Sequence, residues 1–242
     1  SIELNPNDAD SQIVLGRIYL AQEQAEEAKQ AFEKALGIDP KNVQAFLSLA
    51  SVAFRSQKLA EAEDLYRKVL ELEPEQLQAL SGMGEIYLSQ TKYAEAIEIA
   101  KKVLKAIPSG QKSPPREETS AHFILGRAYL LQAGQTEKED QTGAKALYEN
   151  AKTELQQVIA VVPNLAGARY SMGLVNSKLG NLQQAIAEFE EVLRISPDHI
   201  PSLVNVAIAY FQDGQYDSAI ERAKKLKELD PKNHTAYDTL GS

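Results

Sequence analysis

The chain contains no cysteine and no tryptophan, and only three of its 242 residues are histidine. The absence of cysteine excludes disulfide bonds and metal sites built on thiolates. No apolar run approaches the roughly 18–20 residues that a membrane-spanning helix requires. We therefore expect no direct insertion of this segment into a membrane.

Signals of catalytic chemistry are also missing. The histidines, at positions 122, 199 and 234, are far apart and show no metal-ligand spacing. No glycine-rich phosphate-binding loop is present. Adjacent glutamates at 117–118 and 190–191 fall at exposed positions of expected helices, where a solvated face explains them. The sequence therefore predicts no catalytic, cofactor-binding or metal-binding residues and does not indicate an enzyme.

The charge of the chain narrows the class of partner. The formal net charge is −8 and the isoelectric point is near 5.1. Such an acidic chain is a poor candidate for non-specific binding to nucleic acid or to anionic membranes. Because the charges are spread along the expected helix faces, we interpret them as a contribution to solubility.

What the chain does contain is a fixed period marked by proline. Prolines stand at positions 6, 40, 74, 108, 163, 197 and 231, and five of the six intervals between them are 34 residues long. A constant period of this length indicates one supersecondary unit stacked on copies of itself. The remaining interval is 55 residues, which is 21 residues longer than the others.

Alignment on the prolines gives six units, each read as a helix, a short turn and a second helix. One column on the first helix is always small: Gly16, Ala50, Gly84, Gly126, Gly173 and Ala207. One column on the second helix is always alanine: Ala28, Ala62, Ala96, Ala151, Ala185 and Ala219. Small side chains at these positions let the two helices of a unit approach closely. The proline that follows ends the second helix.

The same alignment predicts the helices. The expected spans are 9–22, 25–37, 43–56, 59–72, 77–90, 93–106, 117–132, 145–161, 166–179, 182–195, 200–213 and 216–229. We expect Gly180 and Gly214 to supply turns between helices through positive φ angles. No segment alternates with a period of two, so we predict an all-α fold without strands.

The repeated residues resemble those of the tetratricopeptide repeat family. The resemblance rests on Leu15, Gly16 and Tyr19, and on the later residues Ala28, Phe32, Ala35 and Pro40. It implies a right-handed superhelical solenoid of stacked antiparallel helix pairs. In this family, the concave groove lined by the first helices usually takes a segment of a partner protein.

The period also predicts the organisation of the chain. We expect three units in 1–108, preceded by the end of a truncated repeat, then a linker insertion at 109–118. A fourth unit follows at 119–165, two further units at 166–233, and the start of a truncated seventh repeat or a capping helix at 234–242.

The fourth unit also carries an insertion at 133–145, which is polar and bracketed by Gly134 and Gly143. This insertion is open to two interpretations. It is either a tolerated surface loop, or a docking loop or hinge between two three-repeat halves.

The resemblance also implies a set of groove residues on the first helices. They are Ile13, Arg17, Leu47, Ser51, Arg55, Ser81, Glu85, Phe123, Arg127, Tyr170, Leu174, Lys178, Val204 and Ile208. Arginine and aromatic residues are the usual anchors of protein interfaces. The apolar members have the alternative role of packing between helices.

These observations predict a non-enzymatic scaffold that binds an extended or helical segment of a partner protein in its concave groove. The apolar centre of the groove is expected to supply affinity, and Arg17, Arg55 and Arg127 to pair with carboxylates of the partner. Two alternatives stay open. One is an assembly scaffold that associates with itself, and the other is the targeting arm of a larger enzyme or envelope export machine. A cytoplasmic and a periplasmic location are equally compatible with the sequence.

Overall fold

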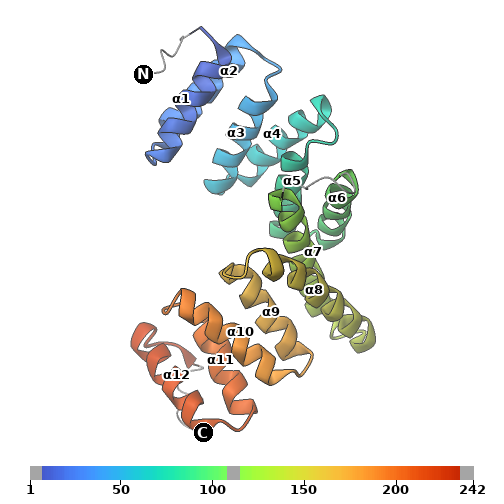
Figure 1. The fold of residues 1–242 in the computed structure, drawn as a ribbon, viewed down its shortest axis with the longest axis vertical. Coiled ribbons are helices and arrows are strands. Elements are labelled where there is room, and N and C mark those ends of the chain that lie inside the picture. The colour runs from blue at the N-terminus through green and yellow to red at the C-terminus, as the bar shows by residue number, and fades with distance from the viewer. Residues whose placement is uncertain (1–6, 108–114, 235–242) are drawn as a thin grey trace. The chain divides into compact units, whose positions relative to one another are not determined.

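The computed structural model describes residues 7–107 and 115–234, and these residues form twelve α-helices and no strand (Figure 1). The helices are α1 Ala9–Ala21, α2 Ala25–Ile38, α3 Val43–Arg55, α4 Leu59–Leu72, α5 Leu77–Ser89, α6 Tyr93–Ala106, α7 Pro115–Thr136, α8 Gln141–Val161, α9 Ala166–Lys178, α10 Leu182–Ile195, α11 Ile200–Gln212 and α12 Tyr216–Leu229. The predicted all-α fold is confirmed. Outside the fourth pair, every predicted span agrees with the structure to within one residue.

The helices form consecutive pairs in two compact units, residues 1–113 and 114–242. Within each unit, the two helices of a pair pack on one another, and the second helix also contacts the first helix of the next pair. Unit 1 holds α1 to α6 and unit 2 holds α7 to α12. The predicted ends of further repeats, in 1–6 and 235–242, and residues 108–114 of the linker lie outside the described residues.

The small column sets the distance between the helices of a pair. Gly173 on α9 faces the ring of Phe189 on α10, and a Cβ atom at Gly173 would lie 2.5 Å from the Phe189 Cε1 atom. Gly16 faces Phe32 in the same way in the first pair. Both phenylalanine rings are fully buried. A glycine therefore lets a large ring of the second helix lie directly on the backbone of the first.

Outside the fourth pair, each turn between paired helices contains one residue in the left-handed conformation. As predicted, Gly180 and Gly214 have φ angles of 77° and 78°. The first three pairs place Glu23, Gln57 and Thr91 at the same turn position, with φ between 60° and 62°. The turn, rather than glycine, therefore dictates this backbone conformation, and a β-branched residue such as threonine is strained there.

Side chains near the repeating prolines cap the N-termini of the first helices. Asn42 accepts a hydrogen bond from the Ala45 N–H at 3.0 Å, and Gln76 accepts one from the Ala79 N–H at 2.9 Å. Each cap satisfies a backbone donor that the first turn of a helix leaves unpaired. The proline and the cap two residues later therefore mark the boundary between successive pairs.

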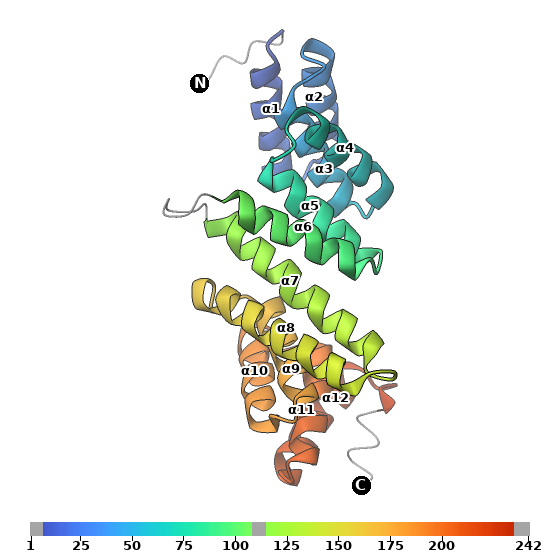
Figure 2. The same cartoon turned by 90° about the vertical axis from the view of Figure 1, so that its right-hand side faces the viewer.

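The fourth pair departs from the prediction. The helices α7 and α8 have 22 and 21 residues, and only 137–140 connect them (Figure 2). The interpretation of 133–145 as a surface loop is therefore wrong for most of this segment. Ala133 and Ala144 are buried and belong to the same core cluster as Tyr148. Because these residues give the prolonged helices an apolar face, the inserted residues extend both helices instead of forming a loop.

We predict that Gly173→Ala destabilises the protein by about 1–3 kcal/mol, because the added methyl group overlaps the Phe189 ring in a packed core. Urea denaturation followed by circular dichroism measures the change. Gly134→Ala is the matched control, since Gly134 is also helical but has open space around it. Equal effects at the two sites would contradict the packing argument.

We predict that Thr91→Gly raises the free energy of unfolding by about 1 kcal/mol, because glycine adopts a φ of 60° without a steric penalty. The reciprocal change, Gly180→Ala, should lower it by a similar amount. Thermal melts of both variants give the comparison. A loss of stability in Thr91→Gly would show that threonine contacts outweigh the backbone strain.

Candidate protein-binding face

Three first helices of unit 2 bring six of the predicted groove residues onto one surface. Helix α9 contacts both α7 and α11. The residues are spaced by four on each helix, which places each pair on one side. We call this surface the A-face of unit 2, formed by Phe123, Arg127, Tyr170, Leu174, Val204 and Ile208.

The aromatic residues of the A-face are held in position. The Tyr170 ring lies 5.8 Å from the Phe189 ring and 5.3 Å from the His199 ring, between ring centroids. Its hydroxyl accepts a hydrogen bond from the Asn205 Nδ2 atom at 3.2 Å, which joins α9 to α11. Burial raises the pKa of Tyr170, so its phenol stays neutral. A fixed neutral phenol is a well-ordered contact for a partner.

Arg127 lies over the ring of Phe123 on the same helix, with its guanidinium carbon 5.4 Å from the ring centroid. Cation–π stacking of this kind orders a long side chain without removing its charge. Both residues are half-buried, and Phe123 packs against the core of unit 2.

The A-face leaves apolar surface available. Leu174 and Val204 are half-buried, and Ile208 is 37% exposed. One turn beyond Ile208 on α11, the Phe211 ring is 41% exposed. The face therefore combines aliphatic and aromatic surface with one ordered guanidinium.

In unit 1 the predicted residues divide into exposed and buried sets. Arg17 and Arg55 are exposed, and neither forms an ion pair or hydrogen bond with a described residue. Ile13 and Leu47 are only 4% and 2% exposed. They belong to core clusters, because their side chains lie between helices. The structure gives Ile13 and Leu47 a packing role.

The other three polar residues predicted in unit 1, Ser51, Ser81 and Glu85, are half-buried. The Ser51 hydroxyl donates to the Leu47 carbonyl oxygen at 2.9 Å. The Ser81 Oγ atom is buried and has no hydrogen-bond partner among the described residues. Glu85 lies on the same helix as Ser81, one turn further along.

Lys178 forms an ion pair with Glu137 of the same chain. Its Nζ atom donates to the Glu137 Oε2 atom at 2.7 Å, and the Tyr148 hydroxyl donates to the same oxygen at 3.2 Å. The Lys178 hydrogen bond holds the pKa of Glu137 below its usual value. The sequence did not reveal this contact, because Glu137 lies in the segment that was interpreted as a loop.

The extension of α7 and α8 thereby builds a polar hollow of about 600 Å³ beside the end of α9. Its lining includes Glu137, Lys145, Tyr148 and Lys178. Burial, followed by the Glu137 carboxylate, raises the pKa of Tyr148 to about 12.

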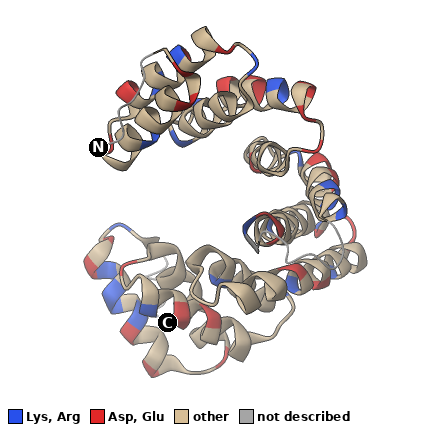
Figure 3. Cartoon of the chain, turned by 45° about the horizontal axis from the view of Figure 1, so that its top comes forward, with Lys and Arg blue, Asp and Glu red and all other residues tan. Residues whose placement is uncertain are grey.

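His122 and His199 each contact a neighbouring group within unit 2. His122 Nδ1 lies 2.6 Å from Glu154 Oε2, and His199 accepts a hydrogen bond from the Ser202 N–H at the start of α11. Among the described residues, no group of three histidine or acidic side chains is placed to hold a metal ion. In the same part of the chain, every helix is too short or too polar to cross a bilayer. Lysines and arginines are interspersed with acidic residues along the helices of each unit (Figure 3).

Family profiles match most of the chain. The profile described as the tetratricopeptide domain of cytochrome c-type biogenesis protein H matches residues 1–113. Two further tetratricopeptide repeat profiles match residues 144–200 and 177–241. Residues 114–143, which include the whole of α7, fall between these matches.

Solved structures resemble the fold over its length. PilW, described as a widely conserved type IV pilus biogenesis factor, has a TM-score of 0.77 and 19% identity, covering 96% of this chain and 98% of that chain. PilF of Pseudomonas aeruginosa has a TM-score of 0.76 and 22% identity, covering 96% of each chain. YrrB, described as having an unusual peptide-binding site, has a TM-score of 0.59 and 21% identity, covering 88% of this chain and all of YrrB. Identities this low establish the fold alone.

Curated relatives are similar over shorter stretches. A CTR9 homolog of Arabidopsis thaliana is 36% identical over 72 residues, which are 30% of this chain and 7% of the relative. A probable biofilm formation methyltransferase, WspC of Pseudomonas putida, is 26% identical over 111 residues, which are 46% of this chain and 22% of the relative. The matches therefore span less than a quarter of either relative.

Stacked helix pairs that present side chains on their first helices define a helical-repeat protein of the protein-interaction class. The repeat columns and the three matching profiles identify the family, and the solved structures agree in fold. The chain belongs to the tetratricopeptide repeat family.

We predict that Tyr148 ionises near pH 12, above its ordinary value of about 10. Because folding disfavours the phenolate, the stability that this shift contributes is complete below pH 10 and is lost as the pH rises through 12. The difference in absorbance at 295 nm between the wild type and Tyr148→Phe gives the titration. A midpoint near 10, with helicity intact by circular dichroism, would contradict the prediction.

Proposed function

We propose that this protein is a non-enzymatic scaffold that binds an extended or helical segment of a partner protein on its first helices. The observation that carries the proposal is the A-face of unit 2, where α7, α9 and α11 present ordered aromatic and aliphatic side chains beside one arginine. Ordering before binding lowers the entropy cost of association. The family is generally non-catalytic, and the proposed activity is binding alone.

The chemistry of the face specifies the segment that fits it. Half-buried Leu174 and Val204 and the exposed part of Ile208 favour apolar side chains at spaced positions. Arg127 favours a carboxylate near them. The preferred partner segment therefore carries spaced apolar side chains and an acidic side chain near them.

Unit 1 carries two cations on its own first helices, which we propose as separate contacts for a partner. Arg17 and Arg55 are exposed on α1 and α3 and have no anionic partner among the described residues. Ile13 and Leu47 are left out of the binding surface because they are core residues. Lys178 is also left out, because Glu137 already pairs with it.

Two proteins of similar fold support the proposal that this protein binds a partner protein. YrrB is described as having a peptide-binding site, which supports peptide binding as an activity that this architecture permits. The pilus biogenesis factor PilW and the cytochrome c biogenesis profile favour, as a second candidate, an arm of an envelope assembly machine. Both candidates use the same binding face and differ in the identity of the partner.

We predict that the A-face controls peptide binding. A peptide selected from a displayed library against the whole protein should bind at least about 30-fold more weakly to Arg127→Glu and to Tyr170→Ala. These residues anchor the face, and loss of an interface anchor costs about 2 kcal/mol or more. Isothermal titration calorimetry measures each affinity, after circular dichroism has shown equal helicity.

The matched control is Arg194→Glu, which reverses a charge on the exposed side of the second helix α10. It should leave the affinity unchanged. If the control weakens binding as much as Arg127→Glu does, net charge rather than the A-face determines binding. If neither A-face variant weakens binding, the proposed surface is wrong.

A further inference from the structure

The hollow between α4, α5 and α6 of unit 1 has apolar walls. Its volume is about 700 Å³, within the range of about 300–1,000 Å³ that is typical of ligand sites. Leu70 of α4, Tyr87 of α5 and Ile99 of α6 line it and are half-buried, so part of each side chain is open to solvent. Leu80 and Met83 also line it and are only 1% and 4% exposed. The surface that a partner can reach is therefore the apolar surface of the walls.

In other parts of the protein, a polar contact crosses the groove between successive second helices. Lys29 of α2 lies 3.4 Å from Glu61 of α4, between Nζ and Oε1. Lys152 of α8 donates to the Gln184 Oε1 atom of α10 at 3.2 Å. In both grooves, the lysine directly follows the alanine column of its pair, and its acceptor directly precedes the alanine column of the next pair.

The groove between α4 and α6 cannot form this bridge, because both positions hold carboxylates. They are Glu63, which follows Ala62, and Glu95, which precedes Ala96. Glu63 instead pairs with Arg67 of its own helix at 2.8 Å. The hollow here is also larger than the hollow of about 420 Å³ between α8, α9 and α10.

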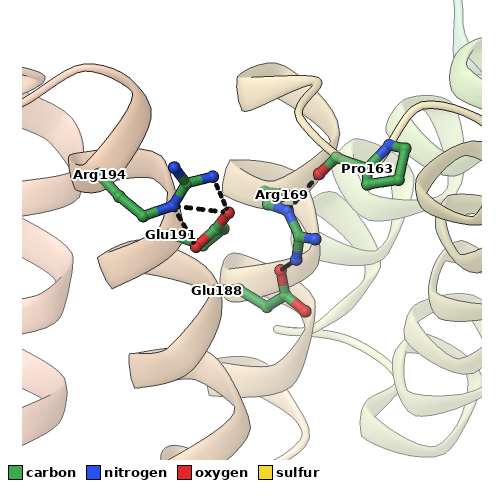
Figure 4. Close-up of polar contacts among 5 residues, drawn as sticks. All are labelled: Pro163, Arg169, Glu188, Glu191 and Arg194. Carbon is green, nitrogen blue, oxygen red and sulfur yellow. Dashed lines mark hydrogen bonds and ion pairs between the residues drawn. The ribbon is translucent and has the colours of Figure 1, made fainter.

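A second pair of positions distinguishes these two hollows. In unit 2, Arg169 of α9 and Glu188 of α10 form an ion pair at 2.7 Å, and Arg169 also donates to the Pro163 carbonyl oxygen (Figure 4). The matching residues in unit 1 are Leu80 and Ile99. Apolar side chains therefore stand where the other hollow has a satisfied ion pair, and the hollow of unit 1 favours an apolar group.

Charges on the α6 side of the hollow are separated along the helix. Glu95 and Glu98 stand near its start, and Lys102 and Lys105 stand near its end, at spacings that place them on one side. All four are exposed, and neither lysine forms an ion pair or hydrogen bond with a described residue. Across the hollow, Arg67 is already paired with carboxylates of α4. The two lysines therefore favour carboxylates of a partner near the end of α6.

We propose that this groove binds an amphipathic helix of a partner protein, with the acidic half of that helix against Lys102 and Lys105. Apolar side chains three and four residues apart on the partner enter the hollow and pack on Leu70 and Ile99. The ridge of side chains on a helix fits the groove between two other helices. An extended segment has no sheet edge to join, because the described residues contain no strand.

The charges also set the direction of the partner helix. Acidic side chains are most favourable in the first turns of a helix, at the positive end of its dipole. The acidic half is therefore the N-terminal half, and basic residues near the C-terminus face Glu95 and Glu98. The partner helix then runs antiparallel to α6, along the length of about 15 Å that separates Glu95 from Lys105.

This groove is separate from the A-face. Its walls are second helices of unit 1, whereas the A-face lies on first helices of unit 2. The two surfaces share no residue, so failure of one proposal leaves the other intact.

The test uses the whole protein labelled with ¹⁵N and a designed peptide of about 18 residues, stapled so that it is helical in solution. The peptide carries leucines three and four residues apart, glutamates in its first half and lysines in its second half. We expect it to shift the amide signals of Leu70, Tyr87 and Ile99. A nitroxide at its N-terminus should broaden the amide signal of Lys105 more than that of Glu95.

A pair of charge variants tests the role of the lysines. Lys102→Glu combined with Lys105→Glu should weaken binding roughly tenfold, the worth of two exposed ion pairs. The control combines Lys34→Glu with Lys224→Glu, which changes the net charge equally at exposed sites on α2 and α12 and should leave the affinity unchanged. A peptide with lysine in place of its glutamates should bind the first variant more tightly than the control.

Glu63→Lys tests the open groove itself. It places a lysine opposite Glu95, as Lys29 stands opposite Glu61, so an ion pair crosses the hollow. Binding of the original peptide should fall roughly two- to fivefold, because that pair must open. Circular dichroism melts establish that each variant is folded.

Four results would overturn the proposal. An absence of shifts at Leu70, Tyr87 and Ile99 would show that the groove does not bind the helix, and shifts confined to the A-face would place the peptide there instead. An equal loss of affinity in the control variant would make net charge the cause. Stronger broadening of Glu95 than of Lys105 would show that the acidic half does not lie against the lysines.

Discussion

In the first, fourth and fifth helix pairs, the constraint on which the packing depends is the contact between a glycine on the first helix and a large side chain on the second. Where Phe189 lies on Gly173 and Leu155 lies on Gly126, the second helix approaches the backbone of the first. Packing at this distance fixes the rotation of the first helix about its axis. That rotation decides which side chains point into the core and which remain on the A-face.

The fourth pair keeps this contact and extends it. Gly126 and Leu155 form the same close approach as in other pairs, while α7 and α8 have 22 and 21 residues, against 13 and 14 in α1 and α2. The added turns bury Tyr148 and place Glu137 where it binds Lys178 of the next pair. The insertion therefore adds an ion pair between the end of α7 and α9, and Lys178 is already paired within the chain.

Departures from the repeat are where the proposed binding chemistry lies. Arg127 and Tyr170 stand at column positions whose occupants differ between repeats, and their environments hold them in fixed orientations. Residues that keep the column pattern, such as Ala185 and Phe189, are fully buried and serve packing.

The sequence by itself determined the repeat, its helices and its turns, because these depend on local properties. Proline ends a helix, small residues permit close contact, and a short turn requires a residue with positive φ, so Gly180 and Pro197 could be interpreted without any tertiary contact. Only the tertiary structure decided that the inserted residues are helical, since Ala133 and Ala144 stabilise the added turns by packing on another helix. It also decided which apolar groove residues are core. Leu47 and Val204 occupy the same column, but Leu47 is buried and Val204 is only half-buried. Their exposure depends on the side chains of neighbouring helices, which no periodicity along the chain encodes.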